Sequence, residues 1–249
     1  MATTKGLDIS AAQGNNVNFA AIKAAGYDFV ILRAGYGSAL TYPNQYDVTF
    51  ENNYAKAKAA GLKVGAYWYT YAIDPTIMVN EAKAFIKALS GKKFEMPVYM
   101  DLEEQNQFKG GITDKLVEAF CSTVEQAGYY VGVYCSTYWY TNFVSSKVRE
   151  RYACWIAEWG SKCNYKGTYG IWQTGTTKVN GSGTGDIDAD ICYVDYTTTI
   201  KSKGLNGYPK PTSNTTTTSN TSTATTAVKS INVTVIIDGK TYTGKLTTK

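Results

Sequence analysis

Two acidic residues stand two positions apart at the end of a hydrophobic stretch, Asp101 and Glu103 in the run Met-Asp-Leu-Glu. Side chains alternate between faces along a strand, so both carboxyl groups are predicted to share one face, with Leu102 on the other. Crowding and partial desolvation favour a proton on one acid, which prepares it to protonate a leaving group near neutral pH. The pair therefore predicts acid–base chemistry, and the alternative is a structural ion pair or loop cap.

The sequence contains no histidine. This excludes Ser-His-Asp and Cys-His nucleophiles, histidine general bases and HExxH zinc sites. The five cysteines form no CxxC pair, so we expect buried, reduced thiols and not a zinc ribbon or a complete disulfide framework. We therefore expect no metal and no cofactor, and any acid–base chemistry has to use other groups.

Further acids fall at the ends of other predicted strands. Asp8 ends the first, and Asp188 with Asp190 repeats the alternating pattern on the last. The first and last strands of a closed barrel are neighbours, and barrel enzymes place their chemistry at the carboxyl ends of the strands. Asp8 and Asp188 are thus expected as supporting acids beside Asp101 and Glu103.

Aromatic residues are the second signal, with 21 tyrosines and clusters at 67–69, 138–140, 155, 159 and 172. Aromatic faces stack on the C–H faces of sugars, so acids beside them suggest a glycan groove. Each single aromatic more often belongs to a core. Tyr67 and Tyr69 share a face and are candidates for the groove.

The elements that must position these residues alternate between short strands and helical segments, as in βα units around a parallel sheet. Helices are expected at 18–25, 49–60, 76–89 and 114–127, with at most one over 136–150 and a Gly- and Thr-rich loop over 160–186. The fold class is α/β, an irregular TIM-like (β/α) barrel with reduced helix content in its second half. The eight predicted strands are 6–10, 28–34, 62–69, 96–103, 130–135, 153–158, 169–173 and 187–193.

The domain division follows composition: a barrel over 1–207, a Thr/Ser-rich linker over 208–227 and a small β segment over 228–249. Residues 231–237 and 240–246 flank Asp238-Gly239 and predict a hairpin with a type I′ turn. A lone hairpin is marginal in water, so we expect it to self-associate or to dock on another surface. The alternative is a frayed tail.

The net charge of +5 belongs to the C-terminal part, where residues 200–249 carry seven lysines against Asp238. Without a basic stripe on the barrel we expect no nucleic-acid binding, and an anionic surface such as a Gram-positive wall is a hypothetical partner for the tail. No stretch approaches the ~18 apolar residues of a membrane span, so we expect no membrane insertion. The N-terminus lacks a signal-peptide pattern, which predicts synthesis in a cytoplasm.

The ordered set of motifs resembles the family-25 glycoside hydrolases, the muramidase-type lysozymes of phages, bacteria and some fungi. The resemblance covers residues 5 to about 200. The motifs that carry it are GLDIS, VILRAGYG, VGAYWY, DLE, YCSTYWYTN, CWIAEW, GIWQTG and DIDADI.

The resemblance implies hydrolysis of the β-1,4 bond between N-acetylmuramic acid and N-acetylglucosamine in bacterial peptidoglycan, in the manner of an endolysin. Glu103 matches the general acid, Asp101 its partner, and Asp8 and Asp188 two further acids. The substrate-binding candidates are Tyr67, Tyr69, Tyr134, Trp172, Gln173, Arg33 and Asp190. Two departures are the absence of Trp-Gln soon after the first Asp and of a histidine near Trp68.

Three mechanisms stay open from the sequence: retaining with two carboxylates, inverting, and assistance by the substrate's acetamido group, which the resemblance favours. Two other functions are alternatives. A family-18-type chitinase or endoglycosidase also carries an acid-x-Glu pair, but within a longer acidic run than this chain has. A non-catalytic wall-binding barrel is the second, although every matched acid is present.

Overall fold

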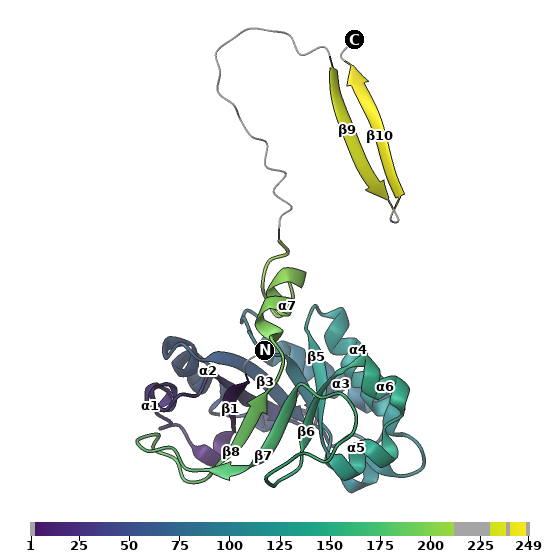
Figure 1. Cartoon of the computed structure of the whole chain (residues 1–249). Helices are drawn as coiled ribbons and strands as arrows, with labels where there is room; N and C mark the ends of the chain where they lie inside the picture. Colours follow the sequence, from purple (N-terminus) through teal and green to yellow (C-terminus); the bar gives the residue numbers. More distant parts are fainter. Residues whose placement is uncertain (1–2, 212–229, 238–239, 248–249) are drawn as a thin grey trace. The chain divides into compact units, whose positions relative to one another are not determined.

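The computed structural model describes residues 3–211, 230–237 and 240–247, which divide into two compact units, Met1–Pro211 and Thr212–Lys249. In the first unit, eight strands form a closed barrel in chain order (Figure 1). The strands are β1 (Thr4–Ile9), β2 (Phe29–Tyr36), β3 (Lys63–Tyr69), β4 (Val98–Asp101), β5 (Val131–Ser136), β6 (Ala153–Ala157), β7 (Ile171–Thr177) and β8 (Ile187–Cys192). The predicted α/β barrel is confirmed.

Helices cover the outside of the first five strands. The α-helices are α1 (Phe19–Ala24), α2 (Phe50–Ala59), α3 (Pro75–Leu89), α4 (Thr113–Gln126), α5 (Thr137–Phe143), α6 (Ser146–Arg151) and α7 (Tyr196–Lys203), and three short 3-10 helices are η1 (Ala11–Gln13), η2 (Pro43–Gln45) and η3 (Gln105–Phe108). Among residues 153–192 no helix separates β6, β7 and β8. The second half of the barrel therefore has the reduced helix content that was predicted.

Three predictions about elements were wrong. The segment 136–150 holds two helices, because Val144 is extended and the Ser145 side chain caps α6 by accepting from the Val148 N–H at 3.4 Å. Helix α7 was missed, although Asp195 caps its start and the left-handed Gly204 follows its end. Strand β8 runs antiparallel to both neighbours, so the sheet is not wholly parallel.

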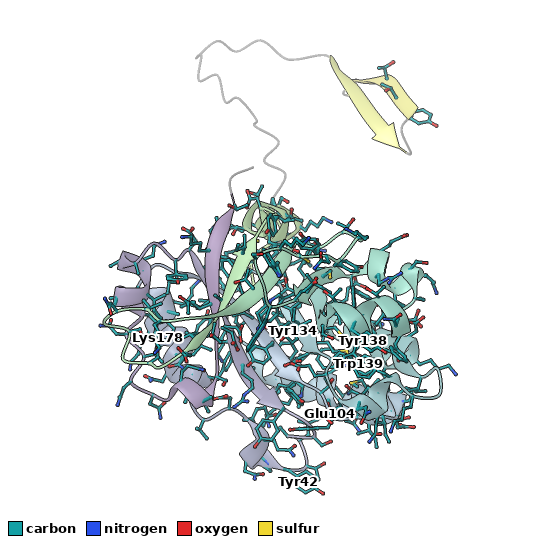
Figure 2. The ribbon with its side chains drawn as sticks, turned by 60° about the horizontal axis from the view of Figure 1, so that its bottom comes forward. Tyr42, Glu104, Tyr134, Tyr138, Trp139 and Lys178 are labelled. Carbon is teal, nitrogen blue, oxygen red and sulfur yellow. The ribbon has the colours of Figure 1, made fainter. Side chains whose placement is uncertain are left out.

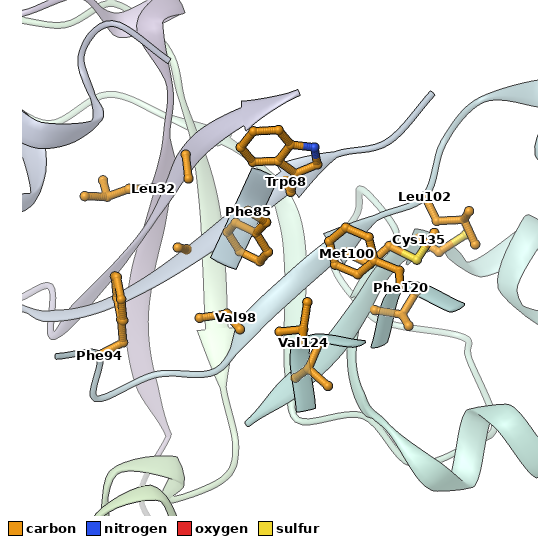
Figure 3. Close-up of a cluster of buried hydrophobic side chains, with 14 of the residues drawn as sticks. Leu32, Trp68, Phe85, Phe94, Val98, Met100, Leu102, Phe120, Val124 and Cys135 are labelled. Atoms are coloured by element: carbon orange, nitrogen blue, oxygen red, sulfur yellow. The ribbon is translucent and has the colours of Figure 1, made fainter. Parts of the chain in front are cut away.

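Two hydrophobic layers hold the barrel. Inside it lie Phe29, Ile31, Tyr99 and Trp155, all with at most 2% of their surface exposed. Outside it, strand residues such as Trp68 and Met100 pack against α3 and α4 (Figure 3). Alternation along each strand assigns the residues to these two layers, which fixes the direction in which each barrel side chain points.

The end of the barrel at which the chain enters is closed by residues after α7. Asn206 is buried, donates to the Met96 carbonyl at 2.9 Å and accepts from the Tyr130 N–H at 2.7 Å. Tyr208 donates to the Glu95 carboxylate. Packing therefore continues past the predicted boundary at 207.

In the second unit, β9 (Ser230–Ile237) and β10 (Lys240–Thr247) form an antiparallel pair with Val235 opposite Tyr242. The predicted turn at Asp238-Gly239 and most of the predicted linker lie outside the described residues. Across the described part of the chain, no helix combines the length and the apolar character needed to cross a membrane.

Candidate active site

The acids meet at one end of the barrel, which Figure 2 turns toward the reader. The carboxyl ends of the parallel strands lie here, and the reversed β8 brings its first residues to the same end. Asp188, the second residue of β8, pairs in register with Asp8 near the end of β1. In an all-parallel barrel Asp188 would lie at the opposite end, so the strand reversal is what adds it to the mouth.

The strand carrying Asp101 is shorter than predicted: β4 ends at Asp101, so Glu103 lies in the loop beyond it, whereas the predicted strand ran to residue 103. Asp101 is 4% exposed and its Oδ1 has no partner within the described residues, whereas Glu103 is exposed at the mouth. Burial raises the pKa of Asp101 well above its usual range, helped by the charge of Glu103 and a hydrogen bond to it. Partial desolvation within the mouth also raises the pKa of Glu103, against the effect of that bond. The pair is thus able to share one proton.

The pKa values of the neighbouring acids are raised as well. Burial, and then the charge of Asp188, raise the pKa of Asp8 to about 8. Burial raises the pKa of Asp188 as well, and that of Asp190 well above its usual range. Asp190 accepts from the Trp155 indole N–H at 2.8 Å through Oδ1, while its buried Oδ2 has no partner among the described residues. The mouth therefore concentrates carboxyl groups with little compensating positive charge.

Gln173 links the acids to the aromatic wall. Its Nε2 donates to Asp8 Oδ2 at 2.9 Å, and its Oε1 accepts from the Tyr134 hydroxyl at 2.9 Å and from the Trp159 indole N–H at 3.0 Å. Gln173 and Tyr134 are thus placed at the mouth as the sequence suggested. Trp159, whose side chain is 63% exposed, belonged to an aromatic cluster in the sequence but not to the candidate site.

On the other side of the mouth lie Tyr67, Tyr69 and Arg33. The Tyr67 ring centroid is 6.0 Å from that of Trp155, and the charges of Asp8 and Asp101 add to the effect of burial in raising its pKa. The Tyr69 hydroxyl donates to Glu104 Oε1 at 2.8 Å. Arg33, paired with Tyr67 in the sheet register, donates through Nε at 2.8 Å to the carboxylate of Asp47.

Asp47 was missed by the sequence analysis. It is 7% exposed and also accepts from the Thr49 and Ala11 N–H groups, both at 2.9 Å. It therefore holds Arg33 in place from a loop after β2. An isolated Asp in a loop gives no such signal in the sequence.

Trp172 is not brought to the mouth. It alternates with Gln173 along β7 and packs in the outer hydrophobic layer, 7% exposed, with its indole N–H donating to the Glu158 carbonyl at 2.8 Å. The expectation that Trp172 lines the groove does not fit this position. Strand alternation was the available signal, because Trp172 and Gln173 cannot both face the interior.

An aromatic patch flanks the mouth after β5 and η3. The Trp139 ring stacks on Phe108 at 4.5 Å, and Tyr138, 62% exposed, lies edge-on to Trp139 at 5.1 Å (Figure 2). Tyr138 and Trp159 thus give the acids an exposed aromatic border, which Trp139 and the buried Phe108 support from beneath. Such a border suits the faces of sugar rings.

A closed barrel with protonatable acids and aromatic rings at its carboxyl end is the arrangement of a barrel glycoside hydrolase. Residues 7–182 match the Glycosyl hydrolases family 25 profile, and the chain belongs to this family.

The chain is similar to the autolytic lysozyme of Clostridium acetobutylicum, with 36% identity over 190 residues, covering 74% of this chain and 55% of the relative. It is 25% identical over 206 residues to lysozyme M1 of Streptomyces globisporus, covering 74% of this chain and 66% of that protein. The chain thus spans between about half and two thirds of the length of these relatives.

Among solved structures, the CTP1L endolysin superposes with a TM-score of 0.70 at 26% identity, covering 80% of this chain and 70% of that one. The modular autolysin LytC of Streptococcus pneumoniae, solved with a synthetic peptidoglycan ligand, gives a TM-score of 0.67 at 24% identity, covering 77% and 47%. The second likeness concerns the fold alone.

Proposed function

We propose that this protein is a lysozyme that hydrolyses the β-1,4 bond between N-acetylmuramic acid and N-acetylglucosamine in bacterial peptidoglycan. The observation that carries the proposal is the gathering of Asp8, Asp101, Glu103 and Asp188 at the barrel mouth, where their charges act on one another. Family membership and the relatives named as lysozymes support it. Peptidoglycan is the proposed partner.

In the proposed mechanism, Glu103 protonates the leaving oxygen and later activates water. Asp101 and Glu103 each affect the pKa of the other, which fits a close pair better than the about 6.5–9.5 Å across which an inverting pair holds a water. We propose attack by the substrate's own acetamido oxygen, with Asp101 orienting that group and Glu103 acting as acid and then base. Tyr67 and Tyr134 are proposed to hold the acetamido group, and Gln173, Tyr69, Arg33 and Asp190 to support the sugar site.

The test is chemical. Peptidoglycan suspensions should clear with wild-type protein, and mass spectrometry of the products should show new reducing ends on muramic acid. Glu103→Gln should slow clearing by about 10²-fold or more. Equal behaviour of the two proteins would favour the non-catalytic wall-binding alternative, and release from chitin instead would favour the family-18-type alternative.

An endolysin role is the finer part of the proposal, supported by the likeness to CTP1L. We propose action at the bacterial wall after release from a host cell, with residues 212–249 assisting wall attachment or self-association. The chain 1–211 should then bind sacculi more weakly, or have a smaller mass in solution, than the full chain. Unchanged wall binding together with unchanged mass would remove this role.

A further inference from the structure

The segment that follows β3, residues 70–72, lies against the end of β4. The Asp101 carbonyl accepts from the Thr70 N–H at 3.1 Å and from the Thr70 hydroxyl at 2.7 Å. Tyr69 and Tyr71, on either side of Thr70, face each other with ring centroids 5.0 Å apart. The backbone at Asp101 is therefore fixed through Thr70.

Gln107, in η3, holds this segment from the β4 side. It is fully buried, and its Nε2 lies 3.2 Å from the Thr70 carbonyl, 3.1 Å from the Thr70 hydroxyl and 3.1 Å from the Ala72 carbonyl. Its Oε1 accepts from the Glu104 N–H at 3.2 Å, and its own N–H donates to the Glu104 carbonyl at 2.8 Å. One side chain thus connects the loop after β4 to the segment after β3.

Glu81, in α3, holds the same segment from the other side. It is 1% exposed, and its carboxylate accepts from the Tyr71 N–H at 3.2 Å and also from the Ala72 N–H. Within the described residues no lysine or arginine pairs with it. Burial raises the pKa of Glu81 to about 7. Burying a carboxyl group without a paired cation lowers the free energy of unfolding. An acid at this position therefore indicates a role that an apolar side chain could not fill, namely accepting hydrogen bonds from the backbone.

We propose that Gln107 and Glu81 are positioning residues that fix the loop carrying Glu103. Glu103 follows the end of β4 and lies between two backbone groups that are hydrogen-bonded. The Asp101 carbonyl accepts from Thr70, and the Glu104 N–H donates to Gln107. Loss of the hydrogen bonds made by Gln107 or by Glu81 would let the Glu103 carboxyl group move relative to the bond that it cleaves. A displacement of about 1 Å is enough to cost about 10²-fold in rate. The inference rests on the proposed role of Glu103.

The test compares variants of similar size without hydrogen-bonding groups, Gln107→Met and Glu81→Met, on soluble uncross-linked glycan strands. We expect kcat to fall about 10²-fold and about 10-fold respectively, with KM within about twofold, because the groove itself is untouched. Glu81→Gln, which keeps one acceptor oxygen, should recover most of the rate. If Gln107→Met does not fold, Gln107→Asn, whose amide is one methylene short, carries the same expectation.

The matched control is Asn206→Ala, which removes an equally buried amide clamp at the opposite end of the barrel. It should lower Tm as much as the test variants do while leaving kcat unchanged. Wild-type kcat in folded Gln107→Met, or an equal loss in Asn206→Ala, overturns the inference. A fully active Glu103→Gln would instead overturn the site assignment, so the two failures are distinguishable.

Discussion

Asp8 and Asp188 lie directly opposite each other on β1 and β8, in the register of an antiparallel pair. Two carboxyl groups facing each other at the barrel mouth favour protonated forms, and the charge of Asp188 contributes to raising the pKa of both Asp8 and Glu103. We therefore expect Asp188 to affect turnover indirectly, by raising the pKa of the neighbouring carboxyl groups of Asp8 and Glu103.

The pH dependence of turnover should respond to Asp188. Replacing Asp188 by Asn removes a negative charge that stabilises protonated Glu103, so the pKa of Glu103 falls and the acid loses its proton at lower pH. The descending alkaline limb of kcat/KM should move toward lower pH by roughly 0.5–1 unit. Asp186→Asn is the control, because its side chain is 61% exposed. An unmoved limb in Asp188→Asn would contradict the electrostatic role.

Stability should rise when Asp190 is neutralised. Its folded-state pKa lies above that of an unfolded aspartate, near 3.9, so folding favours the protonated form. The free energy that the protonated Asp190 carboxyl group contributes to folding is fully present at pH values below the pKa of the unfolded chain. It is lost as the pH rises through the pKa of the folded protein. Asp190→Asn should thus gain about 1–2 kcal/mol at pH 8, roughly 3–6 °C in Tm, and less at pH 5. Thermal unfolding at both pH values measures it, and an equal gain at both would refute the charge argument.

The Tyr134 hydroxyl should matter more for turnover than for stability. In Tyr134→Phe, Gln173 Oε1 keeps its Trp159 donor, so the bridge to Asp8 survives. We expect Tm to change little and kcat to fall about 10-fold, as for loss of one positioned hydrogen bond to a reacting group. Tyr130→Phe, at the other end of the barrel, provides the comparison and should keep full activity.

Trp159, which follows β6, and Trp172, which lies in β7, should respond differently to replacement by alanine. Trp159 is exposed beside Gln173, so Trp159→Ala should raise KM for glycan strands about fivefold or more with little change in Tm. Trp172 packs in the outer layer, so Trp172→Ala should lower the unfolding free energy by about 3–5 kcal/mol. The reverse pattern, measured by kinetics and denaturant unfolding, would show that the groove follows the other face of β7.

Much of the barrel could be predicted from local patterns. Alternation within the strand segments and helical periodicity between them predicted the eight strands and the first four helices, because these signals act over a few residues. The acids Asp8, Asp101 and Asp190 were found for the same reason. The split between α5 and α6 was missed because one serine cap decided it.

By itself, the sequence excluded histidine chemistry, since it contains no histidine, and it placed Asp101 and Glu103 together at the end of one predicted strand. Only the tertiary structure decided the direction of β8, which places Asp188 opposite Asp8, and the face of β7, which turns Gln173 inward and Trp172 outward. It also decided the ion pair between Arg33 and Asp47 and the hydrogen bonds of Gln107 and Glu81 to residues 70–72. Those relationships depend on strand direction and on contacts between segments distant in the chain, which a local pattern does not encode.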